Sequence, residues 1–284
     1  MMNPQATRED FPVHSQNRLS QGQLNMLQTC PRKFQYTYLE HLSSPVTPDQ
    51  REKMAWGSQF HLLMQQRELG LPVEVLLQAD EQMQRCYQGL LEAAPNLFEP
   101  ESLGKQQFRA AEHRRIMNFQ GYLFTVIYDL IIADEFSAQI LDWKTYPLPK
   151  KDRTLEENWQ TRLYPFVLAE TSDYAPEDIT MTYWFVQSAE TGDDRQSKCE
   201  SWTFYYNRLK HQETAQSLTH LLNQLNSWTA DYESRKPFPQ VAVTEGICYT
   251  CPFLTRCQRG GDSGFRLDQG DRSPAFSDIE EVAL

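Results

Sequence analysis

GYLFTVIYDLIIADEFSAQILDWKT, residues 121–145, is the stretch in which a strand pattern and reactive side chains coincide. Residues 124–132 are rich in β-branched and aromatic types, residues 133–138 supply a polar turn, and residues 139–145 return to an apolar run. β-Branched and aromatic residues favour strands, and a short polar segment between two strands favours a reversal of the chain. The stretch therefore predicts a β-hairpin.

The register of this hairpin decides which side chains meet. A loop of residues 134–137 has a common hairpin length, and it pairs Ala133 with Ala138. Pairing outward from there places Asp129 opposite Asp142, with their Cβ atoms about 5 Å apart. Lys144 lies two residues beyond Asp142 and points the same way. A slip of one residue would turn Asp142 and Lys144 to the other face, so convergence of the three charged groups depends on this assumed register.

The face that carries these charges is otherwise apolar, because Ile127, Ile131 and Ile140 share it in this register. Unpaired carboxylates on an apolar surface are costly unless a cation neutralises them. One interpretation is a divalent metal ion at Asp129 and Asp142. The other is a solvated hairpin with a cross-strand Asp–Lys pair, which would be preferred for an arbitrary hairpin. The other motifs of the chain favour the metal ion.

Length and composition set the frame for these motifs. With 284 residues, 40% hydrophobic and 23% charged, the chain predicts one α/β domain with helical additions. It contains no apolar run of the roughly 20 residues that a membrane span needs, and its first residues do not resemble a signal peptide. We therefore expect a cytoplasmic protein that does not bind a membrane. The net charge of −11 argues against a broadly basic nucleic-acid surface, so any such contact must be local.

The chain divides into three parts by composition. Residues 1–19 predict a flexible lead-in, residues 20–261 a single domain, and residues 262–284, rich in Gly, Ser and acidic residues, a disordered tail. Lys150, Lys151 and Arg153 form a short basic cluster after the hairpin, which meets phosphates or is simply solvated.

Further candidate residues lie before and after the hairpin. Gly57 permits close approach of another chain segment, and His61 lies one helical turn beyond it. Residues 108–117 predict a strand that completes a three-stranded meander, in which Glu112 is either functional or a surface carboxylate. Residues 155–170 predict a helix that places Gln160 and Tyr164 on one face.

The cysteines indicate a metal centre. Three of the six fall close together near the C-terminal end: Cys248, Cys251 and Cys257. This spacing is a strong metal-ligand signal in an intracellular chain. Cys30 is the obvious fourth ligand, because Pro31 fixes it at a helix junction, while Cys86 and Cys199 show no partner nearby. Zinc and an iron–sulfur cluster both accept four thiolates, so the spacing alone leaves both open.

Taken in order, the motifs resemble those of the RecB-like PD-(D/E)XK nucleases. The matching residues are His61 in a Gly-x3-His motif, Asp129 on a strand, Asp142-Trp143-Lys144 on the next strand, and Gln160 and Tyr164 on the following helix. The four cysteines resemble the iron staple of the AddB nuclease domain and of the CRISPR-associated RecB-like exonucleases. The resemblance covers residues 20–257.

This resemblance implies a restriction-endonuclease-like PD-(D/E)XK core, with a mixed central sheet flanked by helices. It implies Mg²⁺ or Mn²⁺ held by His61, Asp129, Asp142 and the main-chain carbonyl of Trp143. Lys144 would orient or help to deprotonate the attacking water. Gln160 and Tyr164 would contact DNA or support Lys144. Cys30, Cys248, Cys251 and Cys257 would hold a 4Fe-4S cluster that joins the N- and C-terminal segments.

The sequence departs from the family pattern at three places. Tyr128 stands where the family has a proline before the aspartate, and Val126 lies near the position of a frequent glycine. Pro165 directly follows Tyr164. None of these departures removes a catalytic group.

The function that follows from the resemblance is a metal-dependent DNA nuclease, an exonuclease on single-stranded ends in repair, recombination or CRISPR adaptation. The alternative is a catalytically idle DNA-end-binding or scaffold subunit of a helicase–nuclease or integration complex. A third hypothesis is a zinc-stapled protein with an unrelated hairpin. The chain carries no Gly-x4-Gly-Lys-Ser/Thr loop, so ATP-driven unwinding would require a helicase partner.

Overall fold

A computed structural model describes residues 17–98, 108–148, 152–186 and 199–259. None of the helices in these ranges is both long enough and apolar enough to cross a membrane. The N-terminal elements are β1 (Arg18–Leu19), α1 (Gln21–Thr29), α2 (Pro31–Phe34), the π-helix η2 (Gln35–Leu39), α3 (Pro48–Glu68), α4 (Glu74–Ala79), α5 (Glu81–Ala93) and α6 (Pro95–Phe98). The central elements are β2 (Phe108–Phe119), β3 (Tyr122–Ala133), β4 (Ala138–Lys144), α8 (Asp152–Glu157), α9 (Trp159–Glu170), η3 (Pro176–Asp178), β5 (Ile179–Phe185) and β6 (Glu200–Tyr205). The C-terminal elements are α10 (Arg208–Glu233), η4 (Val243–Glu245) and η5 (Ile247–Thr250).

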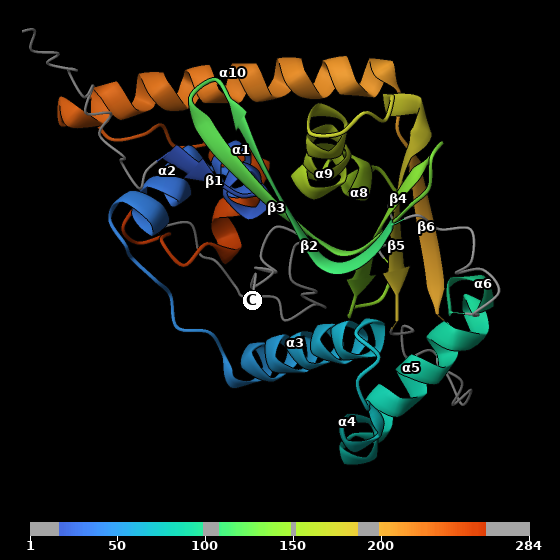
Figure 1. The fold of residues 1–284 in the computed structure, drawn as a ribbon. Coiled ribbons are helices and arrows are strands. Elements are labelled where there is room, and N and C mark those ends of the chain that lie inside the picture. Colours follow the sequence, from blue (N-terminus) through green and yellow to red (C-terminus); the bar gives the residue numbers. More distant parts are fainter. Residues whose placement is uncertain (1–16, 99–107, 149–151, 187–198, 260–284) are drawn as a thin grey trace, which may run out of the picture.

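The strands form one mixed, six-stranded sheet in the order β1-β3-β4-β5-β6, with β2 also paired to β3. β1 runs parallel to β3 and β4 parallel to β5, whereas the other pairs are antiparallel. The hairpin and the three-stranded meander β2-β3-β4 predicted from the sequence are confirmed. The chain crosses from β4 to the parallel β5 through α8 and α9, which brings that helix pair onto one face of the sheet (Figure 1).

Helices cover both faces of the sheet and divide the interior into two cores. The first core joins the sheet to α1, α9 and α10, and the second joins it to α3 and α5 (Figure 1). Leu163 and Leu222 are fully buried in the first core, and Phe60 and Leu90 in the second. The predicted mixed sheet flanked by helices is therefore confirmed.

β3 changes the face that it presents to each core at Asp129. Tyr128 and Ile131 pack in the first core, whereas Leu130 packs in the second. Residues two apart share a face in a regular strand, so the alternation shifts here by one residue. On β2, Glu112 has φ 48°, and Glu112 and Asp129 are not paired in the otherwise continuous β2–β3 register. The two strands bend strongly in their middle (Figure 1), and Glu112 and Asp129 lie where the alternation shifts.

This shift corrects one detail of the expected apolar face. Ile131 and Ile140 pack together in the first core as predicted. Ile127 precedes the shift, is only half-buried and belongs to neither core. The sequence pattern predicts that side chains alternate regularly between the two faces through Asp129. The alternation shifts there instead, opposite the left-handed backbone of Glu112.

Capping residues begin a new helix at two places in the chain. The helix expected over residues 155–170 is two helices, because Asn158 caps α9 with its side chain, which accepts a bond from the Gln160 amide. Asp80 likewise caps α5 and separates it from α4. A side chain that satisfies the free amides of a first helical turn favours a new start at that point.

The two ends of the described chain meet on one side of the molecule. The segment that follows α10 lies beside α1 and α2 (Figure 1). The amide of Phe238 donates to Gln35 Oε1 at 2.7 Å, and Arg32 Nε donates to the carbonyl of Phe238 at 2.7 Å. Arg18–Leu19 pair with β3, so the sheet begins inside the stretch predicted as a lead-in. Residues 1–16 and the predicted tail lie outside the described residues.

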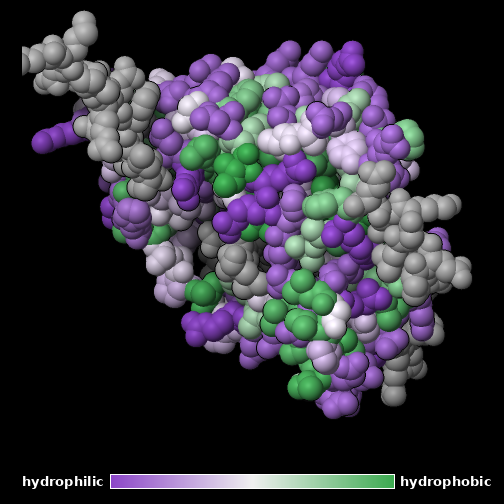
Figure 2. All heavy atoms as spheres, viewed as in Figure 1, coloured by the Kyte–Doolittle hydropathy of each residue, from purple (hydrophilic) through white to green (hydrophobic). Residues whose placement is uncertain are grey.

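Most of the face seen in Figure 2 is polar, and apolar side chains gather on it over α3 and α4. Leu69, Leu71 and Val75 at this corner are 65%, 50% and 75% exposed. Most of the large apolar side chains of the described chain are instead buried in the two cores.

Candidate active site

His61 reaches the sheet because α3 packs closely against the end of β4. Gly57 is buried in α3, and a Cβ atom at this position would lie 3.0 Å from the Thr145 hydroxyl, just beyond Lys144. A larger residue would force the Thr145 side chain or the helix to give by a few tenths of an ångström. His61 follows one turn later on the same side of α3. The glycine therefore permits the close approach of the helix that carries this histidine.

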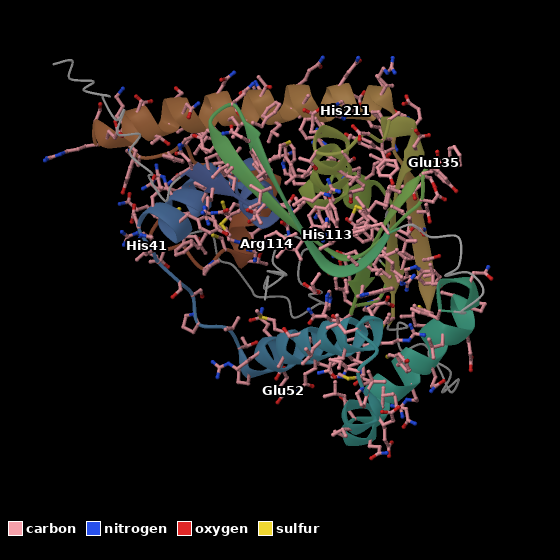
Figure 3. The ribbon with its side chains drawn as sticks, viewed as in Figure 1. His41, Glu52, His113, Arg114, Glu135 and His211 are labelled. Atoms are coloured by element: carbon pink, nitrogen blue, oxygen red, sulfur yellow. The ribbon has the colours of Figure 1, made fainter. Side chains whose placement is uncertain are left out.

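Three side chains from three elements form a compact polar group. His61 on α3, Glu112 on β2 and Asp129 on β3 place one ligand atom each within 4.8 Å of one another. His61 Nδ1 lies 3.3 Å from Asp129 Oδ2. Figure 3 labels His113 and Arg114, the two residues after Glu112, which mark this part of β2 above α3. A group of one imidazole and two carboxylates could bind a divalent metal ion.

The charge state of Glu112 depends on this setting. Burial and the nearby Asp129 carboxylate raise the pKa of Glu112 from 4.5 to about 7, and His61 acts in the opposite direction. Near neutral pH the carboxyl therefore exchanges readily between its neutral and charged forms. A cation bound here would favour the charged form, because an opposite charge nearby lowers a carboxyl pKa.

The hairpin has the register assumed from the sequence. Ala133 pairs with Ala138 and Leu130 with Leu141, and the regular ladder ends before Asp129. Asp129 Oδ2 accepts a bond of 2.7 Å from the main-chain amide of Trp143, the residue that follows Asp142.

This bond brings the Asp129 carboxylate beside the part of β4 that carries Asp142. The predicted role of Asp142 as a ligand of the same metal ion stays a prediction. The predicted role of the Trp143 carbonyl as a metal ligand stays a prediction.

Asp142, Lys144 and Gln160 form a second, buried cluster beside the first. Lys144 Nζ lies 2.7 Å from Asp142 Oδ1 and donates to Gln160 Oε1 at 2.8 Å, and Gln160 Nε2 donates to Asp142 Oδ2 at 2.6 Å. The residues are 2%, 2% and 5% exposed. These bonds fix the amide orientation of Gln160 and hold the ammonium of Lys144. Of the two roles expected for Gln160, the geometry favours support of Lys144.

Tyr164 is placed differently from Gln160. It is 3% exposed, its ring contacts that of Tyr128 at 5.4 Å between centroids, and its carbonyl accepts from the Tyr128 hydroxyl at 3.0 Å. In this arrangement Tyr164 packs in the first core and does not face solvent.

Sequence reasoning missed two residues around the second cluster. The Thr161 hydroxyl lies 2.8 Å from that of Tyr183, and the Tyr183 ring centroid lies 5.0 Å from Lys144 Nζ. Thr161 follows Gln160 directly, which was a signal available in the sequence. Tyr183 is one of several aromatic residues on β5, so its pairing with Asp142 on β4 emerges only from the sheet.

The four cysteines singled out in the sequence line one cavity. Cys30, which ends α1 and begins α2, faces Cys248, Cys251 and Cys257 across it. Burial raises the pKa of the Cys251 and Cys257 thiols, and the thiol of Cys30 adds to both shifts.

The other two cysteines pack elsewhere, in the second core. The expectation that they have no partner nearby is wrong, because Cys86 contributes to raising the pKa of Cys199 to about 12, after burial. Lys150 and Lys151 of the predicted basic cluster lie outside the described residues.

Comparisons with known proteins place this arrangement in a family. The comparison with curated proteins finds no match. Two solved structures are similar to this chain at TM-scores below 0.5. The protein SSO0001 is 15% identical at a TM-score of 0.38, over 87% of this chain and 88% of its own. A Eubacterium rectale protein provisionally named an exonuclease is 9% identical at 0.49, over 95% and 100%. A family model of the PD-(D/E)XK nuclease superfamily matches residues 18–258. Because this match spans most of the chain, the chain belongs to the PD-(D/E)XK nuclease superfamily.

Proposed function

We propose that this chain is a divalent-metal-dependent deoxyribonuclease that acts as an exonuclease on single-stranded DNA ends. The observation that carries the proposal is the meeting of His61, Glu112 and Asp129 within 4.8 Å, on the bend of a sheet whose next strand holds Lys144. Membership of a nuclease superfamily supports hydrolysis of phosphodiester bonds.

The donor set suits Mg²⁺ or Mn²⁺, because carboxylate oxygens are ligands that these ions prefer. A bound ion would supply a Lewis acid for the phosphoryl oxygen and lower the pKa of a bound water. We propose that Glu112 and Asp129 hold the cation with His61. The Trp143 amide orients Asp129 for this role through the bond of 2.7 Å.

Lys144 and Asp142 act beside this metal group. We propose that Lys144 orients the attacking water and steadies the negative charge that grows on the phosphate. Gln160 and Asp142 hold the ammonium in place, as the distances of 2.8 and 2.7 Å indicate. Asp142 is a metal ligand in the family pattern, and in our proposal its carboxylate reaches the ion while it remains next to Lys144.

We propose further that the four-cysteine cavity holds a 4Fe-4S cluster. The four cysteines that line this cavity could supply the four thiolates that such a cluster needs. A single zinc ion also accepts four thiolates, and metal analysis of the purified protein distinguishes the two.

The cellular pathway and the partner protein are proposed from the kind of substrate. Single-stranded ends arise when a duplex is unwound, so we propose a helicase or integrase as the partner, in repair, recombination or CRISPR adaptation. The DNA-bound partner would bring the substrate to a chain whose net charge is −11.

The test is digestion of linear single-stranded DNA carrying a label at either end, with circular single-stranded DNA and RNA in parallel. The protein is purified without oxygen and assayed with Mg²⁺, with Mn²⁺ and with EDTA. Asp129→Asn and Lys144→Ala should each lower the rate by about 10³-fold or more. Lys210→Met is the matched control, because Lys210 pairs with Glu156 on the surface.

Loss of one end label before the other from linear DNA, with circular DNA intact, is the expected result. Cleavage of circular DNA would contradict the exonuclease mode. Tight binding of ends without cleavage by any metal-loaded form would replace the enzyme with the idle end-binding subunit.

A further inference from the structure

We infer that Tyr183 is a positioning residue for Lys144, a role that rests on the proposed function of this site. Tyr183 is 1% exposed and lies on β5, whose register pairs it with Asp142 on β4. The sheet therefore fixes its place relative to the strand that carries Lys144. Tyr183 contacts the buried cluster through both its ring and its hydroxyl.

The ring of Tyr183 forms one wall around the ammonium of Lys144. Lys144 Nζ lies 5.0 Å from the ring centroid, with Asp142 and Gln160 as its polar neighbours. The negative face of an aromatic ring attracts a cation, and the attraction is strongest where water is excluded. Lys144 is 2% exposed, so this condition is met.

The direction of the Tyr183 hydroxyl bond follows from its neighbour. Thr161 donates its single hydroxyl hydrogen to the carbonyl of Leu155 at 2.6 Å. In the 2.8 Å contact between the two hydroxyls, Tyr183 must therefore be the donor. The same hydroxyl also lies within donating distance of Gln160 Oε1, at 3.5 Å, which is the longer and weaker of its two contacts.

Thr161 and Gln160 are consecutive residues in the first turn of α9. The bond from Tyr183 to Thr161 therefore ties β5 to the turn that presents Gln160 to Lys144. Loss of this bond frees the turn and lets the ammonium move relative to the reacting phosphate. Displacements of this kind lower the rate of the chemical step more than they weaken substrate binding.

The test compares kcat and KM for graded variants on single-stranded DNA. Tyr183→Phe keeps the ring and removes the hydroxyl, so kcat should fall about tenfold with KM little changed. Tyr183→Leu removes the ring as well, and kcat should fall about a hundredfold. Thr161→Val should match Tyr183→Phe, and Thr161→Ser should retain most of the activity that Thr161→Val loses.

Tyr174→Phe is the matched control, because the Tyr174 hydroxyl donates to the carbonyl of Asp134 in the hairpin loop at 2.5 Å. Tyr174→Phe should lower the melting temperature by about as much as Tyr183→Phe does, and it should leave kcat unchanged. A Tyr183→Phe variant with the same kcat as the wild type, or with a raised KM and an unchanged kcat, would overturn the inference.

A double-mutant cycle separates this inference from the proposed function. The free energy of unfolding in urea is measured in EDTA for Lys144→Met, Tyr183→Leu and the double variant. Contact between the two residues predicts that the double variant is less destabilised than the sum of the single variants. Additive effects would overturn the inference whether or not the wild type cuts DNA. A wild type that cuts no DNA, with coupling present, would instead refute the nuclease proposal alone.

Discussion

Glu112 has a left-handed backbone, with φ 48°, although it is not a glycine. A residue other than glycine in this conformation costs about 1–3 kcal/mol, and such strain concentrates at functional sites. Here the strained residue interrupts the β2–β3 pairing opposite Asp129 and lies in the group with His61. This cost in free energy is consistent with a strained conformation that positions the Glu112 carboxylate in the group.

The raised pKa of Glu112 predicts how stability depends on pH without metal. The folded protein binds a proton between about pH 4.5 and 7 that the unfolded chain has released. Glu112 thus contributes stability below about pH 4.5, and this contribution is lost as the pH rises through 7. In EDTA, the free energy of unfolding should fall between pH 5 and 8 by more in the wild type than in Glu112→Gln, as urea denaturation would measure.

Glu135→Gln is the control for this prediction, because Glu135 is an exposed carboxylate in the hairpin loop (Figure 3). The free energy of unfolding of Glu135→Gln should fall between pH 5 and 8 by as much as that of the wild type. If the curves of Glu112→Gln and the wild type run parallel, the carboxyl of Glu112 has an ordinary pKa.

At the scale of elements, α3 is tied to the sheet by a paired charge. Arg109 on β2 donates to both carboxylate oxygens of Glu68 at 2.6 and 2.8 Å. The side chains are 15% and 8% exposed, so the pair is largely screened from water. Because α3 carries His61 and β2 carries Glu112, this pair helps to hold the two ligands in register.

Loosening this tie should weaken metal binding. Arg109→Met leaves Glu68 without its bidentate partner and should cost about 3–5 kcal/mol of unfolding free energy. The affinity for Mn²⁺, measured by isothermal titration, should fall about tenfold, because the position of His61 becomes less defined. Arg85→Met removes an exposed pair with Glu81 and should change neither quantity. Unchanged Mn²⁺ affinity in a destabilised Arg109→Met protein would show that α3 does not position the site.

Some of the arrangement of these helices and strands could be predicted from the sequence alone. The hairpin register was predictable, because a four-residue loop and a period of two determine it together. The shift in alternation at Asp129 was not predictable, because no residue type indicates a glutamate at positive φ. Asn158 was a visible capping signal, and reading it would have divided the predicted helix correctly. The network around Lys144 depends on pairing between β4 and β5, which are far apart in sequence.

At the scale of the whole molecule, the four-cysteine cavity joins the beginning of the domain to its end. Cys30 precedes α2, and the other three thiols follow α10. The backbone bonds of Phe238 to Gln35 and Arg32 hold the same two segments together. A metal cluster there would close a loop of most of the chain and stabilise the folded state relative to the unfolded one.

Replacing one ligand tests this closure. Cys257→Ser should purify without iron, lose its brown colour and melt at a lower temperature than the wild type, because the loop is no longer closed. Iron and zinc are measured by mass spectrometry of the purified protein. Cys199→Ser, a substitution in the second core, should keep the iron. Stoichiometric zinc in the wild type would contradict the cluster and support a zinc staple.

The position of a bound metal ion is the most direct test of the account. Crystals grown with Mn²⁺ and single-stranded DNA would be measured at the manganese absorption edge, where anomalous scattering locates the ion. The proposed site predicts an anomalous peak in contact with His61, Glu112 and Asp129, beside Lys144. A peak held by other residues, or an active enzyme with no ion at this group, would contradict it.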